Sequence, residues 1–250
     1  MTAVNKPLVR KGWLSAGIIV LILILTLYLL LVGEIDLAIA FGVYALILIQ
    51  SRLRLSRIIF GFPGAPTLRR LLRSVVFFLP LPFLGLPHER SMSWGIVAGL
   101  IYGALFILWR LPELRFNLSA EFISILPPVT REDRVREAFH PILGAVAQEY
   151  FYRGVMLYLL ASRLGLWSVM IATLLFTAEH FMHFDALQAF DWKDYVLQTL
   201  LGLGVGVIFY FSGSLIGCIL GHVVYNCPGA IQVLRRRLVP RYPVGEHGLF

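Results

Sequence analysis

The chain has 250 residues, of which 58% are hydrophobic and only 14% are charged, and its mean hydropathy is +0.80. These values are typical of a polytopic membrane protein and exclude an ordinary soluble domain. The net charge of +8 would suit nucleic acid, but the basic residues cluster between apolar segments, so we expect no nucleic-acid partner.

Eight apolar segments are expected to cross the membrane as helices, which makes the fold class all-α. They cover residues 13–32, 37–49, 75–86, 92–109, 141–160, 166–182, 195–211 and 215–234. The first follows a basic start and, at about 20 residues, suits a permanent span better than a cleaved signal peptide. The third contains Pro80 and Pro82, which predict a short, kinked or re-entrant helix.

The connections carry predictions of their own. In the long polar connection before the fifth segment, residues 118–126 are amphipathic and are expected to lie along the membrane interface. Thr130, followed by acidic residues, is the predicted N-cap of a helix that leads into that segment. In the seventh segment, three glycines, Gly202, Gly204 and Gly206, would permit close contact between helices.

The distribution of basic residues predicts the orientation in the membrane. All but three of the 22 Lys and Arg lie outside the spans, on the same side of the membrane as the amino terminus. Arg90 and Arg163 fall on the opposite side, and Arg153 lies within a span. This bias predicts a multi-pass protein of the plasma (inner) membrane with both termini in the cytoplasm.

The chain divides into three predicted parts. Residues 1–140 hold four spans with basic cytoplasmic loops, residues 141–234 form a core that carries the polar motifs described below, and residues 235–250 form a loose basic tail. Cys218 and Cys227 are nine residues apart on one predicted helix, too distant to bridge each other, and both are interpreted as buried thiols.

A carboxylate and a guanidinium within the fifth apolar segment are the first sign of function. Glu149 and Arg153 would each cost roughly 2.5–3.5 kcal/mol at membrane depth, and such residues usually mark a site. Because they are four residues apart, they share a helix face and can pair. A structural ion pair and a functional site are both open at this point. Phe151, between them, is expected to pack against neighbouring helices.

Two later stretches favour the functional interpretation. One ends in Phe176-Thr-Ala-Glu179-His180, and the other reads His222-Val-Val-Tyr-Asn226. Each again places polar groups on one face of an apolar helix. Polar residues on three such helices can converge only if they line a shared cavity, which we expect to be conical and to lie in the cytoplasmic half of the bilayer.

These residue types suit hydrolysis by an activated water. A carboxylate paired with an imidazole can act as general base. A second histidine and an asparagine amide can stabilise an oxyanion, at about 2.7–4 kcal/mol per donor. Such a set would be supplied by Glu149, His180, His222 and Asn226. No serine or cysteine stands beside a base in these motifs, so a covalent nucleophile is not favoured.

Zinc hydrolysis is the main chemical rival. His180, His222 and a glutamate could bind zinc with an open coordination position. The sequence lacks the HExxH motif of the common zinc proteases, so we expect no metal and no other cofactor, and rank these two histidines as improbable ligands.

The three stretches resemble the motifs of the CAAX-protease and bacteriocin-processing (CPBP or Abi) family of intramembrane proteases. That family carries Glu-Glu-x-x-x-Arg, Phe-x-x-x-His and His-x-x-x-Asn/Asp, in this order, on an eight-helix core. The resemblance covers about residues 141–230. It implies a glutamate-dependent, metal-free peptidase that cuts a membrane-associated peptide or protein near its C-terminus. The substrate types left open are a peptide pheromone, a bacteriocin leader and, as in the myxosortase-like branch, the C-terminal sorting tail of a surface protein. It further implies that the first motif and His180 activate water, while His222 and Asn226 stabilise the oxyanion.

This chain departs from the family pattern at one position. Gln148 stands where the family has its first glutamate, which is usually assigned as the base, and an amide cannot accept the proton in the same way. Either Glu149 takes the role, or Glu179 supplies it, or the chain is inactive. We therefore list Gln148, Arg153 and Glu179 as supporting residues.

Two other function classes stay open. A catalytically inactive membrane scaffold or bacteriocin-immunity protein would use the same fold. A carrier of small solutes ranks last, because the sequence shows neither half-repeats nor paired helix breaks. The expected partners are a membrane-associated substrate and the lipid bilayer, and the sequence leaves the oligomeric state open.

Overall fold

The computed structural model describes residues 6–53, 73–84, 93–182 and 191–239. Most of the chain in these ranges is helical, and the described part contains no β-strand beyond one isolated bridge between Val129 and Leu238. The prediction of an all-α membrane protein is therefore confirmed. Four described helices are long and apolar enough to cross a membrane, or five if α6 (Ser93–Trp109) and α7 (Leu111–Asn117), which meet at a 72° bend, form one span.

The number of spans is smaller by this measure than the eight predicted. Two further apolar helical stretches, Arg73–Leu84 and Trp167–Met182, are shorter than a usual span. The first is broken into η1 (Val76–Phe78) and α5 (Leu81–Leu84), as its prolines predicted. The fifth predicted segment belongs to a longer helix that begins in polar sequence.

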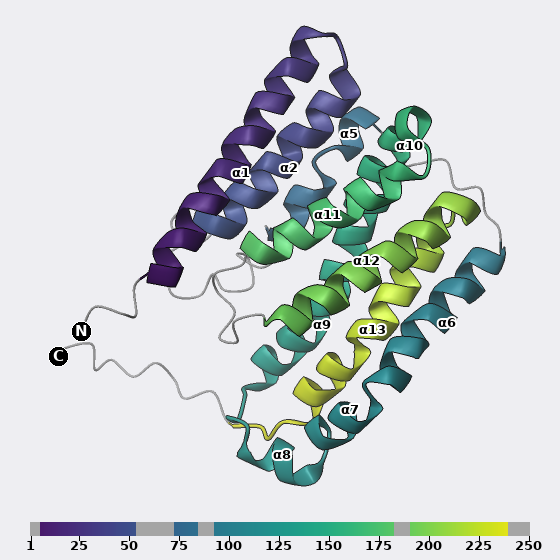
Figure 1. Ribbon diagram of the computed structural model, residues 1–250. Coiled ribbons are helices and arrows are strands. Elements are labelled where there is room, and N and C mark those ends of the chain that lie inside the picture. The colour runs from purple at the N-terminus through teal and green to yellow at the C-terminus, as the bar shows by residue number, and fades with distance from the viewer. Residues whose placement is uncertain (1–5, 54–72, 85–92, 183–190, 240–250) are drawn as a thin grey trace.

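Helices α1 (Lys6–Leu31) and α2 (Ile35–Leu53) form an antiparallel pair at one side of the molecule (Figure 1). Gly33 turns the chain between them with φ +81°, a conformation that suits glycine. Helix α1 is peripheral, because only 17% of its most apolar stretch is buried, whereas 61% of the corresponding stretch of α2 is buried. The Tyr44 hydroxyl on α2 donates to the Leu175 carbonyl at 2.8 Å, which joins the pair to the rest of the bundle.

The opposite side consists of α6 (Ser93–Trp109), α12 (Trp192–Ser212) and α13 (Leu215–Arg235), which lie side by side (Figure 1). Helices α6 and α13 approach so closely that their glycines meet backbone to backbone. A Cβ on Gly99 would lie 1.9 Å from the Gly217 carbonyl oxygen, and one on Gly103 would lie 2.3 Å from that of Gly221. Small residues at four-residue spacing allow this contact.

The predicted role of the α12 glycines in close packing is confirmed. A Cβ on Gly204 would fall 2.0 Å from the ring of Tyr102, and one on Gly202 would fall 3.1 Å from Phe176. Tyr102 also donates from its hydroxyl to the Leu200 carbonyl at 2.7 Å, which locks α6 against α12.

A single long helix runs through the middle of the molecule from residue 131 to residue 164. It consists of α9 (Arg131–Glu149), a π-helical stretch η2 (Tyr150–Leu157) and α10 (Tyr158–Leu164). Thr130 is its N-cap, as predicted, and accepts from the backbone N–H of Asp133 at 3.1 Å. Every residue of η2 is buried. Helix α11 (Trp167–Met182) returns after a turn at Gly165 and packs on η2 and α12.

The polar connection contains α7 (Leu111–Asn117) and α8 (Ala120–Ile125), so the predicted amphipathic stretch is helical in part. Its position at a membrane interface stays a prediction. The expected loose tail is wrong for residues 235–239. Val129 pairs with residues 237 and 239 through backbone hydrogen bonds of 2.9 and 3.0 Å, and Arg236 donates to the Pro127 carbonyl. Residues 240–250 lie outside the described part.

Two contacts agree with the predicted topology. Glu34 and Arg163, which fall in two predicted external turns, form an ion pair, so these turns lie at one end of the bundle. Arg236 and Glu137, from two predicted cytoplasmic segments, pair at 3.2 Å. Both cysteines are free; Cys218 is buried as expected, but Cys227 is only half-buried.

Candidate active site

The site begins with two polar stripes on the long central helix. Gln148 and Tyr152 face α11, whereas Glu149 and Arg153 face α13 and α12. Each stripe joins residues four apart, which a helix places on one face. Neighbouring residues therefore serve different partner helices, because successive side chains on a helix point about 100° apart.

Glu149 is fully buried and both of its carboxylate oxygens have partners. Oε1 lies 2.7 Å from His222 Nδ1 on α13, and Oε2 lies 3.1 Å from Arg153 Nε. The contact with Arg153 is an ion pair whose atoms are not aligned for a hydrogen bond. Because a carboxylate only accepts, Nδ1 of His222 carries the hydrogen between the two groups.

Arg153 connects this pair to α12. Its Nη2 donates to the Gly202 carbonyl at 2.8 Å, and its guanidinium lies 5.1 Å from the centre of the Phe176 ring. The close approach of Gly202 is what brings that carbonyl within reach. A buried charge of this kind needs both an opposite charge and hydrogen bonds, and Arg153 has both.

The second carboxylate, Glu179 on α11, is also buried. Its Oε2 accepts from Gln148 Nε2 at 2.9 Å and lies 3.5 Å from the Tyr152 hydroxyl. The same oxygen lies 3.8 Å from Nδ1 of the neighbouring His180. The structure thus contains two carboxylate–histidine pairs, one between α9 and α13 and one within α11.

His180 is oriented by its own helix. Its Nδ1 lies 2.9 Å from the carbonyl of Phe176, which can only accept, so Nδ1 carries the hydrogen. A neutral imidazole in this tautomer has its lone pair on Nε2, the nitrogen suited to accept a proton. The centre of the His180 ring also lies 4.5 Å from that of the tilted Phe176 ring, whose other neighbours include His222 at 6.0 Å.

Asn226 lies one turn beyond His222 on α13 and donates to the Pro141 carbonyl of α9 at 3.0 Å. It also borders a cavity of about 440 Å³ between α6, α7, α12 and α13. Arg110, Gln198 and Tyr225 are further lining residues. A single conical cavity that joins all the predicted site residues stays a prediction.

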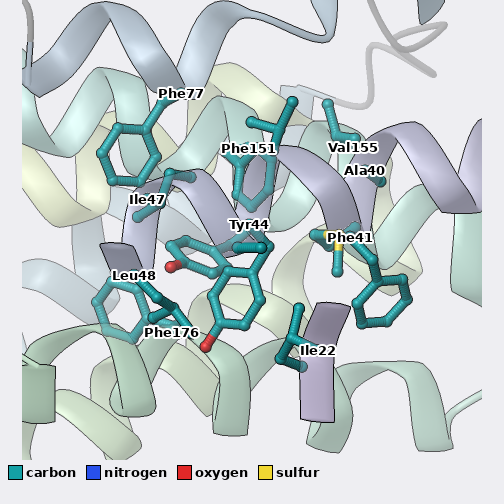
Figure 2. Packing of buried hydrophobic residues seen from close by; sticks show 14 of the residues in the cluster. Ile22, Ala40, Phe41, Tyr44, Ile47, Leu48, Phe77, Phe151, Val155 and Phe176 are labelled. Carbon is teal, nitrogen blue, oxygen red and sulfur yellow. The ribbon is translucent and has the colours of Figure 1, made fainter. Parts of the chain in front are cut away.

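Aromatic packing fixes the central helix at the level of the site. Phe151 is fully buried and packs against Tyr44 at 6.5 Å and Phe77 at 5.9 Å, so its predicted packing role is confirmed (Figure 2). Tyr152 lies next to Phe176 at 5.4 Å (T-shaped) while its hydroxyl reaches Glu179. These contacts leave the backbone around the motif little freedom to move.

The structure brings the predicted residues together but in an arrangement that differs from the simplest expectation. The histidine in contact with Glu149 is His222 rather than His180. Three features were missed by sequence reasoning: the π-helical stretch, the Tyr152 contact and the Pro141 carbonyl. Of these, Tyr152 had a signal, because it lies four residues from Gln148 within the same motif. In the described part of the chain, no three His, Cys, Asp or Glu side chains form a group that could hold a metal ion.

The fold and these contacts define an all-α integral membrane protein with two buried carboxylates, each beside a histidine, on the three helices α9, α11 and α13. Residues 138–228, which contain all three motifs, match the family described as type II CAAX prenyl endopeptidase Rce1-like. This segment is thus similar to the CAAX-protease family that the three motifs resemble, and the similarity implies a peptidase that acts on a membrane-associated protein. No curated protein matches the chain, and no solved structure matches it.

Proposed function

We propose that this protein is an intramembrane endopeptidase that hydrolyses a peptide bond near the C-terminus of a membrane-associated protein or peptide. The observation that carries this proposal is the burial of two carboxylates, each beside a histidine, within the segment that matches the family. Ionisable groups at such a depth usually serve function. The protein would lie in the plasma (inner) membrane with both termini in the cytoplasm, so the substrate would be cut on the cytoplasmic side.

The chemistry requires a base for water and donors for the oxyanion. The base takes one proton from water as the remaining hydroxide oxygen bonds to the peptide carbonyl carbon. When the C–N bond of the resulting tetrahedral intermediate breaks, the proton passes to the amine nitrogen and the base is restored. His180, with its lone pair at Nε2, is placed to orient that water.

His222 and Asn226 supply the oxyanion donors in this mechanism. Because Nδ1 of His222 is engaged by Glu149, its Nε2 can donate to the oxyanion only when the ring carries both protons. Asn226 has two amide N–H groups and uses one for Pro141, so the other suits the oxyanion. No metal or other cofactor takes part in the proposed steps.

A comparison of protein C-termini in native-host cells tests this function. Cells would carry wild type, His180→Ala, Asn226→Ala or Gln232→Ala at matched expression. Gln232 is the control, because it lies on the same helix and donates to a carbonyl at 3.1 Å, as Asn226 does at 3.0 Å. We expect particular processed C-termini to disappear in the first two variants and to persist in the control.

The same comparison decides against the main alternative. If every C-terminus persists in His180→Ala and Asn226→Ala cells, the chain is an inactive scaffold or an immunity protein, and Gln148 has replaced an essential carboxylate. If processing occurs, the sequence around the new C-termini defines the substrate and shows whether a myxosortase-like specificity applies.

A further inference from the structure

The two buried carboxylates of the site differ in what surrounds them. Glu149 has no exposed surface, and its two oxygens contact a histidine nitrogen at 2.7 Å and a guanidinium nitrogen at 3.1 Å. Its charge is therefore balanced by Arg153, and a water molecule could approach its oxygens only by displacing His222 or Arg153. These are the surroundings of a group that holds other groups in place.

Glu179 has surroundings of another kind. The donors identified at its Oε2 are the Gln148 amide at 2.9 Å and the Tyr152 hydroxyl at 3.5 Å, both of them neutral. Its neighbour His180 has 11% of its side chain exposed, against 3% for His222. Of the two carboxylate–histidine pairs, the one on α11 therefore lies nearer to a surface that water reaches.

The amide of Gln148 links these observations to the departure from the family motif. Its Nε2 donates to Glu179, so the side chain that replaces the usual glutamate points directly at another carboxylate. Gln148 and Glu179 together supply one amide and one carboxylate, and the carboxylate is on α11 instead of α9. This contact therefore still contains one negative charge, on Glu179, although Gln148 in the first motif is neutral where the family has a glutamate.

We propose that Glu179 is the catalytic carboxylate, which acts with His180 on the attacking water, and that Glu149 is a positioning residue for His222. This assignment rests on the proposed endopeptidase function. Glu179 takes one proton from water while the hydroxide oxygen bonds to the carbonyl carbon. The proton then passes to the amine nitrogen as the C–N bond breaks, which returns Glu179 to its carboxylate form.

Three variants and a control variant test the assignment in native-host cells, with the rate of appearance of processed C-termini as the readout. Glu179→Gln keeps an acceptor for Gln148 and removes the base, so we expect processing to fall by at least about 10²-fold. Glu149→Gln keeps an acceptor for His222, and we expect a smaller loss. Glu121→Gln, at an exposed position on α8, is the control for the change of acid to amide.

The third variant exchanges the amide of Gln148 and the carboxylate of Glu179. Gln148→Glu combined with Glu179→Gln retains one carboxylate, one amide and their total volume across the 2.9 Å contact. We expect this double variant to process faster than Glu179→Gln alone, because the carboxylate returns to the same contact from the other helix. A merely structural role for Glu179 is tested by Glu179→Gln alone, which keeps the hydrogen bond with Gln148 and would then process as fast as the control.

The outcomes separate this inference from the proposed function. If wild type processes termini and Glu179→Gln does so as fast as the Glu121→Gln control, the assignment of Glu179 is overturned while the endopeptidase function stands. A larger loss in correctly folded Glu149→Gln than in Glu179→Gln overturns it equally. If wild type processes no terminus at all, both the function and the assignment are overturned.

Discussion

Gly99→Ala should damage both the stability and the activity of this protein, although Gly99 lies on a helix that carries none of the site residues. The added Cβ would lie 1.9 Å from the carbonyl oxygen of Gly217, whereas ordinary contacts begin at 3.4 Å. Helices α6 and α13 must therefore separate by about 1.5 Å. Overpacking of this kind typically costs about 1–3 kcal/mol.

The displaced helix carries His222 one turn away from the contact. A shift of about 1 Å in a catalytic group can cost on the order of 10²-fold in rate, so we expect processing of C-termini to fall by about that factor. Stability can be followed in detergent by heating the protein with a thiol-reactive fluorescent dye. Cys218 is fully buried in the folded state and reacts only on unfolding.

Gly17→Ala is the matched control, because a Cβ at Gly17 on α1 would meet nothing within 4 Å. Alanine favours helices over glycine by up to about 1 kcal/mol, so this variant should unfold at the same temperature as wild type or slightly higher. If Gly99→Ala unfolds and processes like Gly17→Ala, then α6 and α13 do not approach as described, and the coupling of their contact to the site is refuted.

Three further predictions use other contacts. Arg153→Met should destabilise the fold by about 3–5 kcal/mol in the dye assay, because Glu149 is left as an uncompensated buried charge, and adding Glu149→Gln should recover part of the loss. Thr130→Ala should cost about 1 kcal/mol, seen as faster hydrogen exchange in the first turn of α9, with processing unchanged. Treatment of the purified protein with a metal chelator should leave processing unchanged; a loss of activity that zinc restores would contradict the metal-free mechanism.

Much of the fold follows from local features of the sequence. Apolar runs located helices such as α11 and α13 to within a few residues, and Thr130 marked the start of α9. The boundaries that were missed lie where a helix continues into polar sequence, as α9 does for ten residues before Pro141. Apolarity locates the part of a helix that suits a membrane, not the place where its hydrogen bonds begin.

The composition of the site was predictable, whereas its pairing was not. The spacing of Glu149 and Arg153 predicted their contact, because both lie on one helix. Which histidine contacts which carboxylate depends on how α9, α11 and α13 rotate against each other. That rotation is set in part by the contact between glycines on α6 and α13. Glycines at four-residue spacing indicate that a helix makes a close contact, but they do not identify the helix that packs against it. The contacts of the 235–239 segment escaped prediction for the same reason, since they are made with residues about 100 positions away.

The π-helical stretch gives the central helix one place where its length can change. A π-helical turn accommodates a residue more than the α-helical pitch would require over the same rise. Removing one residue beyond Arg153 within Tyr150–Leu157 would therefore let the helix continue as a regular α-helix. The four-residue stripes at the end of α9 would still face α11 and α13, because α9 and α10 would stay close to their present relative rotation. A one-residue deletion in a regular α-helix instead rotates the two flanking parts by about 100° relative to each other. Such a deletion within α9 should thus disturb the packing of the central helix more than a deletion in the π-helical stretch.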